Sequence, residues 1–237
     1  MPILNNLTVN EIVSGQVPNY YLKKAIDGNG KLIVDTSQTT FSTSPATDVG
    51  TSALAAVMYK RSGTGNITVD CSSLTKISGE NAFANAFYGA SDVTSYDFSN
   101  ITTITGRRAF ENAWGYITSG GSASLSFPAL ERIGAANVFA YCLSDNTRTT
   151  NVSFPSLTRI NTSGFVYAFA NSAITTLTLG GTAAITFDSI STLRYMFEGC
   201  EQSITVNAPL ASKTDIEAQD GYPEFGSYGT VTWNWVS

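Results

Sequence analysis

The stretch LSFPALERI at Leu125–Ile133 returns 27 residues later as VSFPSLTRI at Val152–Ile160. Both copies carry Phe, Pro, Leu, Arg and Ile at matching positions. A period of this length is typical of solenoids, in which one supersecondary unit repeats and buries its apolar side against the next unit. The sequence therefore predicts a repeat architecture.

Further copies of this unit can be traced from about Thr51 to residue 211. Each unit has an apolar residue four positions before a second one, a spacing that places both on one face of a short helix. The second residue of each pair is Met58, Phe87, Trp114, Cys142, Phe169 and Phe197. The matching strand positions are Val69, Phe98, Phe127, Phe154, Leu179 and Val206. About six units can bury a common core, since three or more are generally needed.

The two ends of the chain lack this repeat. The turn Asp27-Gly28-Asn29-Gly30 between β-favouring runs predicts a hairpin, so residues 1–50 are expected to form a small β module that docks to a partner or caps the solenoid. Near the C-terminus, alternation with period two places Trp233 and Trp235 on one face of a strand. Residues 212–237 are expected to form an aromatic capping strand, and the alternative is an exposed platform that stacks on sugar rings.

Composition excludes several classes of function. The net charge of −5, from 13 basic and 18 acidic residues, argues against a nucleic-acid partner. The chain has no histidine, which excludes His-dependent triads and makes zinc catalysis unexpected. Cys71, Cys142 and Cys200 lack metal-site spacing and are expected to be buried as small apolar residues. No segment reaches the roughly 18 apolar residues of a membrane span.

Two sets of polar residues recur at fixed positions of the units and are candidate contact surfaces. The outward strand positions would form one ladder of hydroxyls with a single carboxylate that contacts a polysaccharide, namely Thr68, Asp97, Ser126, Ser153, Thr178 and Thr205. The second set would form a track for an anionic glycopolymer or an acidic neighbour, and it comprises Lys76, Thr103, Arg132 and Arg159. For both sets the alternative is an ordinary solvated surface.

The segments FPSLTRINTSGFVYAFANSAITTLTL (154–179) and LRYMFEGC (193–200) resemble the BspA-like leucine-rich repeats. In that family a strand is followed by an L-T-x-I-G segment and an A-F-x-x-C/N helix. The resemblance covers roughly residues 51–211, although a regular Asn ladder is missing. It implies a non-enzymatic surface or adhesion role, and similar Ser/Thr-rich versions occur in phage-encoded proteins.

We therefore expect an α/β solenoid of about six units with a parallel β ladder and short helices. The expected function is non-enzymatic recognition by a phage or tail-like particle component, a receptor-binding or decoration protein that contacts a bacterial surface or glycan outside the cell. The N-terminus shows no signal for ordinary secretion, which favours a particle. The alternatives are a bacterial cell-surface adhesin, a purely structural virion protein and, last, a depolymerase with paired carboxylates.

Several further expectations follow from this assignment. No cofactor, metal or membrane insertion is expected, and acidic residues such as Glu198 and Glu201 are expected to be solvated. The N-terminal module would join other particle proteins or a second copy of the chain. The candidate binding residues are Lys76, Arg132, Arg159, Trp233 and Trp235.

Overall fold

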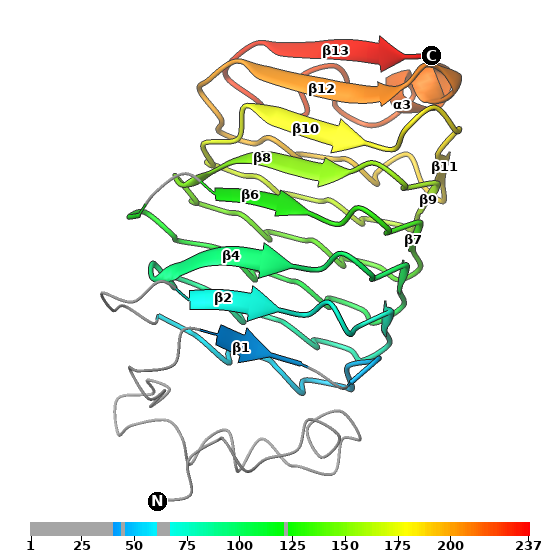
Figure 1. Cartoon of the computed structure of the whole chain (residues 1–237). Coiled ribbons are helices and arrows are strands. Elements are labelled where there is room, and N and C mark those ends of the chain that lie inside the picture. Colours follow the sequence, from blue (N-terminus) through cyan, green and yellow to red (C-terminus); the bar gives the residue numbers. More distant parts are fainter. Residues whose placement is uncertain (1–39, 44–45, 61–66, 121–122) are drawn as a thin grey trace, which may run out of the picture.

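The computed structural model describes residues 40–43, 46–60, 67–120 and 123–237, so the hairpin expected at residues 27–30 lies outside the described part. The described chain winds into a β-solenoid of about six turns, and its paired strands run parallel (Figure 1). Each complete turn has three sides: a strand of a main sheet, a short strand of a second sheet and a run of reverse turns. The predicted solenoid and its parallel ladder are confirmed.

The main sheet receives one strand from each turn. Its described strands are β1 (Thr40–Ser42), β2 (Ile67–Asp70), β4 (Val93–Asp97), β6 (Ala123–Ser126), β8 (Thr149–Phe154), β10 (Thr176–Leu179), β12 (Ile204–Pro209) and β13 (Val231–Val236). Hydrogen bonds join β1, β2 and β4 into one ladder and β6, β8, β10, β12 and β13 into another. The two ladders lie side by side in Figure 1, where β4 neighbours β6. Strand β1 precedes Thr51, where the repeat was expected to begin, and it pairs in register with β2.

The second sheet is built from two-residue strands. They are β3 (Lys76–Ile77), β5 (Thr103–Ile104), β7 (Arg132–Ile133), β9 (Arg159–Ile160) and β11 (Thr186–Phe187). In the first four, the isoleucine is buried and the residue before it points outward. This alternation follows from the period-two geometry of a strand. The short strands therefore close the core from a second side.

The third side consists of reverse turns where the sequence predicts short helices. In the run of reverse turns around Ala56, every second backbone N–H donates to a carbonyl oxygen of the following solenoid turn, as from Leu54 to Ala82. The N–H groups between them donate to the carbonyl three residues earlier, as from Val57 to Leu54. Every fourth residue has positive φ, for example Ser52, Ala56 and Lys60. A helix would require i−4 bonds and negative φ throughout, so the helical prediction is wrong at these segments.

The i, i+4 spacing of apolar residues that predicted helices also occurs in this run of reverse turns. Because the backbone conformation repeats every four residues, apolar side chains at i and i+4 lie on the same inward side. Leu54 and Met58 are both buried, as are Phe83 and Phe87. The described helical elements are the 3₁₀ turn η2 (Leu210–Ser212) and the α-helix α3 (Lys213–Glu217). No helix of the described part is long and apolar enough to cross a membrane.

Two piles of aromatic rings fill the core along the solenoid axis. On the turn side Phe83, Phe110, Phe139 and Phe165 stack in succession, with centroid distances of 5.0, 5.3 and 5.4 Å. On the main-sheet side Phe98, Phe127 and Phe154 stack at 4.9 and 5.4 Å. Rings of the two piles meet edge to face, a favourable arrangement for aromatic pairs. The phenylalanines of LSFPALERI and of its copy therefore belong to the core.

The last strand extends the ladder to the C-terminal end of the solenoid. Strand β13 pairs with β12 along its whole length, which aligns Trp233 with buried Val206 and Trp235 with buried Ala208. Both indole rings therefore lie on the inward side of the final rung. Trp233 packs against the rings of Tyr222 and Phe225 at 5.8 Å each, and Trp235 stacks on Trp233 at 5.5 Å. Both residues are half-buried.

The three cysteines are buried and unpaired, as predicted. Burial raises the pKa of each thiol, so the nucleophilic thiolate is scarce at neutral pH. We expect the folded protein to react slowly with a colorimetric disulfide reagent at pH 8, and all three thiols to react at once in guanidinium chloride. A measured burst of one or more thiols from the native protein would contradict the buried placement.

Candidate functional site

The predicted cationic residues share one column on the second sheet. Parallel pairing aligns Lys76 with Thr103, Thr103 with Arg132 and Arg132 with Arg159. The column is nevertheless partly neutralised. Lys76 Nζ lies 3.3 Å from Asp48 Oδ2, and Arg159 lies 3.0 Å from Asp188 Oδ1. Arg132 has no ion pair with a described residue, so the column presents less net charge than its sequence suggests.

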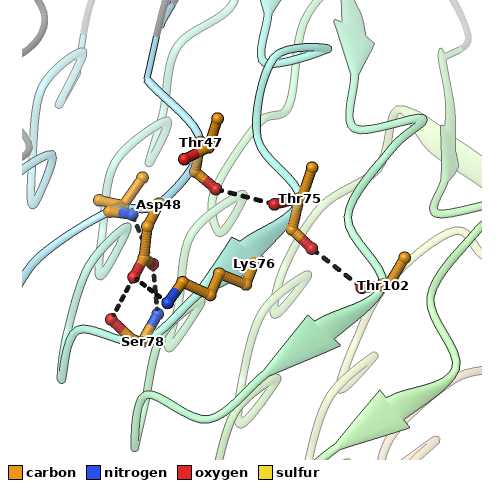
Figure 2. A network of polar contacts seen from close by, with 7 residues as sticks. Thr47, Asp48, Thr75, Lys76, Ser78 and Thr102 are labelled. Atoms are coloured by element: carbon orange, nitrogen blue, oxygen red, sulfur yellow. Dashed lines mark hydrogen bonds and ion pairs between the residues drawn. The ribbon is translucent and has the colours of Figure 1, made fainter.

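Lys76 belongs to a cluster of polar groups around the Asp48 carboxylate. Asp48 accepts hydrogen bonds from the Ser78 backbone N–H at 2.9 Å and from the Ser78 hydroxyl at 2.7 Å, and the ammonium of Lys76 completes the cluster (Figure 2). Beside it, the hydroxyls of Thr75 and Thr102 donate to the backbone carbonyl of the preceding turn. These contacts join successive turns, so Lys76, which the sequence offered as part of a binding track, belongs to a structural cluster.

The outward face of the main sheet carries two polar columns instead of the single ladder that was expected. Register places Thr68 beside Ser95 and Asp97 beside Asp70, so two of the expected ladder residues fall in different columns. Over strands β6 to β13 both columns are uncharged. One column contains Ser124, Asn151, Thr176, Thr205 and Thr232, and the other contains Ser126, Ser153, Thr178, Asn207 and Asn234.

These ten side chains are exposed or half-buried and alternate with buried core residues. Neighbouring strands in a sheet lie about 4.8 Å apart, so hydroxyl and amide groups recur at that interval along the solenoid axis. Asn234 donates to Asn207 Oδ1 at 2.8 Å, which shows that neighbours in a column are close enough to act together. The arrangement provides an uncharged hydrogen-bonding face that extends over five strands. We call it the polar sheet face.

A tyrosine ladder on the turn side was not predicted. One tyrosine comes from each of six successive turns, namely Tyr59, Tyr88, Tyr116, Tyr141, Tyr167 and Tyr195. The first three rings are in contact at 5.1 and 5.2 Å, with Tyr116 tilted by 37° from Tyr88, and the last three stack at 5.1 and 5.0 Å. Burial raises the pKa of Tyr88 and of Tyr167, and neighbouring tyrosines raise both further, so these phenols stay protonated at neutral pH.

A one-per-unit count of tyrosine would have found this ladder in the sequence. The signal was hidden because its position shifts relative to the large apolar residue used to align the units. Tyr88 follows Phe87 directly, whereas Tyr167 precedes Phe169 by two residues. The structure explains the shift, because the ladder moves one residue later between the second and third turns and four residues earlier between the third and fourth turns.

The remaining candidates do not gather into a catalytic arrangement. Among the described residues, no group of three or more His, Cys, Asp or Glu residues could hold a metal ion. A hollow lined by Arg194, Tyr195, Asp220 and Gly221 lies near the C-terminal end of the tyrosine ladder. Trp233 and Trp235 lie at the last rung, on a side of the sheet opposite to its polar face. The five predicted binding residues therefore occupy two separate surfaces.

Comparison with known proteins finds no matching family model, no similar curated protein and no similar solved structure. The solenoid of about six turns is therefore established by the geometry of the chain itself.

Proposed function

We propose that this protein is a non-enzymatic surface-recognition or adhesion protein that contacts a polymer on a bacterial surface. The polar sheet face is the observation that supports this proposal. A repeating row of hydroxyl and amide groups suits a ligand that also repeats, because each weak contact adds to the others along the chain. Charge is absent from both columns between β6 and β13, which fits a neutral glycan better than an anionic one.

The same proposal includes the finer family and the setting. Motif order and unit length resemble the BspA-like leucine-rich repeats, and Ser/Thr-rich relatives of that kind in phages favour a phage or tail-like particle component. In that setting the part of residues 1–50 that precedes β1 would attach the solenoid to other particle proteins. A bacterial cell-surface adhesin of the same family is the second candidate, since it would use the same face on the same class of ligand.

Adhesion to bacterial cells tests the proposal. Fluorescently labelled protein is mixed with a panel of Gram-positive and Gram-negative cells, and the fraction bound is measured by flow cytometry. The double variant Ser124→Arg and Asn151→Arg places two long cations at adjacent exposed positions of the polar sheet face. We expect at least tenfold weaker binding because the arginine side chains prevent close approach of a polymer, which removes several contacts at once.

Two control variants locate the contact surface. Thr162→Arg adds the same side chain at an exposed position outside the sheet and should leave adhesion unchanged. Arg132→Glu reverses the cation in the second-sheet column that lacks an ion pair with a described residue. Loss of adhesion with Arg132→Glu and retention with the double variant would move the contact to the cationic column. Absence of adhesion to every cell type would overturn the proposed function.

A further inference from the structure

The two tyrosine stacks are closed at their outer ends. The Nζ atom of Lys60 lies over the Tyr59 ring, 5.4 Å from its centroid, at the N-terminal end of the first stack. At the C-terminal end of the second stack, the guanidinium of Arg194 lies over the Tyr195 ring at 4.6 Å and donates to its hydroxyl. A cation over an aromatic face is a favourable contact, so both outer rings have a partner.

The inner ends of the stacks do not meet. The Tyr116 N–H donates to the Ser144 carbonyl, which places Asp145 next to Tyr116 on the following turn. The Asn112 N–H donates to the Ala140 carbonyl, which places Asn112 next to Tyr141 on the preceding turn. The ladder therefore steps sideways, and each inner ring faces a short polar side chain where the stack would otherwise continue. We call Asn112, Tyr116, Tyr141 and Asp145 the tyrosine step.

The exposure of the rings agrees with this geometry. Tyr116 is 54% exposed and Tyr141 is 42% exposed, whereas the other four ladder tyrosines are only intermediate. A tyrosine ring extends well beyond the end of an asparagine or aspartate side chain from the same backbone level. The outer part of one face of Tyr116 and one face of Tyr141 is therefore uncovered by the described residues.

Hydrogen-bonding groups lie at the base of both open faces. Asp145 accepts one hydrogen bond, from the Ser144 hydroxyl to Oδ2 at 2.9 Å, and its other carboxylate oxygen has acceptor capacity left. The Asn112 amide donates to Asn85 Oδ1 at 2.9 Å, which directs the amide and keeps its own carbonyl oxygen as an acceptor. Each site thus combines an apolar ring face with a planar acceptor beside it.

We propose that the tyrosine step binds two neutral sugar rings of a glycan chain, one on Tyr116 and one on Tyr141. A sugar ring offers an apolar C–H face for stacking and hydroxyl donors at its rim, and this pattern matches both sites. A cationic ligand would match only the site beside Asp145. This inference rests on the proposed recognition role and adds the chemical class of its ligand, on a different side of the solenoid from the polar sheet face.

Saturation-transfer NMR tests the proposal with defined probes. Cellohexaose, maltohexaose and chitohexaose are each titrated into the full chain, and tetramethylammonium chloride serves as the cationic probe. We expect saturation transfer to the C–H protons of at least one glycan, with shifted ring signals of Tyr116 and Tyr141. The proposal is overturned if none of the three glycans gives transfer, or if tetramethylammonium alone shifts these signals.

Matched variants separate stacking from folding. Tyr116→Asn with Tyr141→Asn removes both rings while keeping a residue type that the chain itself uses at positive φ, as at Asn85 and Asn171. We expect glycan affinity to fall about tenfold, as for other stacked rings. Tyr116→Phe with Tyr141→Phe retains the ring faces and should stay within about threefold of the native affinity. Tyr228→Asn removes a tyrosine that is 78% exposed and lies outside the ladder, and it should leave the glycan affinity unchanged.

The outcomes also distinguish this site from the proposed function. If the double asparagine variant adheres to cells and binds glycan as tightly as the native chain, the tyrosine step is excluded while the recognition role stands. If Ser124→Arg with Asn151→Arg stops adhesion but glycan still shifts the ring signals of Tyr116 and Tyr141, the tyrosine step binds glycan independently of the polar sheet face. If the native chain binds glycan at the step but adheres to no cell, the step stands and the cell-surface role fails.

Discussion

Replacing Phe110 with alanine is expected to lower the free energy of unfolding by about 4 kcal/mol, the usual cost of truncating a fully buried phenylalanine. Phe110 has 0% exposure and stacks between Phe83 at 5.0 Å and Phe139 at 5.3 Å. It also meets Phe127 edge to face at 5.5 Å, so it joins both aromatic piles. The measurement is urea denaturation followed by circular dichroism.

The position of Phe110 in the array gives a second readout. Each turn of a solenoid contacts only its neighbours, so a cavity in the third turn weakens the coupling between the two halves. We expect the unfolding transition to broaden, with a lower dependence of the free energy on urea concentration. Phe187→Ala is the matched control, because Phe187 is half-buried on the last strand of the second sheet. An equal decrease in the free energy of unfolding for both variants would contradict the central role of the aromatic piles.

The strand side of this core could be predicted from sequence for a clear physical reason. Alternation of buried and exposed residues in a strand has period two, and the 27-residue repeat fixes which residues stack. Phe127 and Phe154 therefore come out as core residues from LSFPALERI and its copy alone, and both are buried. Ile133 and Ile160 follow from the same alignment and are buried as well.

The turn side could not be predicted in the same way. An α-helix and a run of reverse turns that repeats every four residues both place apolar residues at i and i+4. Only the carbonyl groups that accept the backbone N–H bonds distinguish the two structures. In this protein every second acceptor lies on the neighbouring turn of the solenoid, as in the bond from the Met58 N–H to the Ala86 carbonyl. The frequent positive φ at non-glycine residues such as Asn85 and Tyr141 has no simple sequence signature either.

The candidate site was predictable only in part, because the number of residues between paired strands varies along the main sheet. Matching Val69 to Phe98 assumed a spacing of 29 residues, whereas β2 pairs with β4 at a spacing of 27, so Asp70 and not Thr68 lies beside Asp97. The cationic column was correctly aligned, since the Ile that follows each of its members fixes the register. Its neutralisation was not foreseeable, because Asp48 precedes Thr51, where the repeat was expected to begin, although the Lys76 N–H bond to the Thr47 carbonyl places Asp48 in the same column. Asp188 lies just after the last strand of the second sheet.

Replacing Gly106 with alanine is expected to lower the free energy of unfolding by about 3 kcal/mol, at the upper end for overpacking a tight contact. A Cβ atom at Gly106 would run into the backbone carbonyl of Gly79 on the preceding turn. A Cβ at Gly79 would in turn meet the carbonyl of Gly50. Backbone atoms in this corner cannot move without separating the hydrogen-bonded turns, so the added methyl strains the stack directly.

Gly134→Ala is the matched control, since Gly134 directly follows Ile133 whereas Gly106 lies two residues after Ile104. Its N–H donates to the Ile104 carbonyl just as the Thr105 N–H donates to the Ile77 carbonyl, so Gly134 corresponds to Thr105, where the chain already carries a Cβ. An added Cβ would lie 3.3 Å from side-chain atoms of Arg132 and Thr105, which can adjust. We expect a change within about 1 kcal/mol, of either sign. Thermal denaturation of the two variants measures the difference, and a loss at Gly134 as large as that at Gly106 would show that backbone contact between turns does not set the cost.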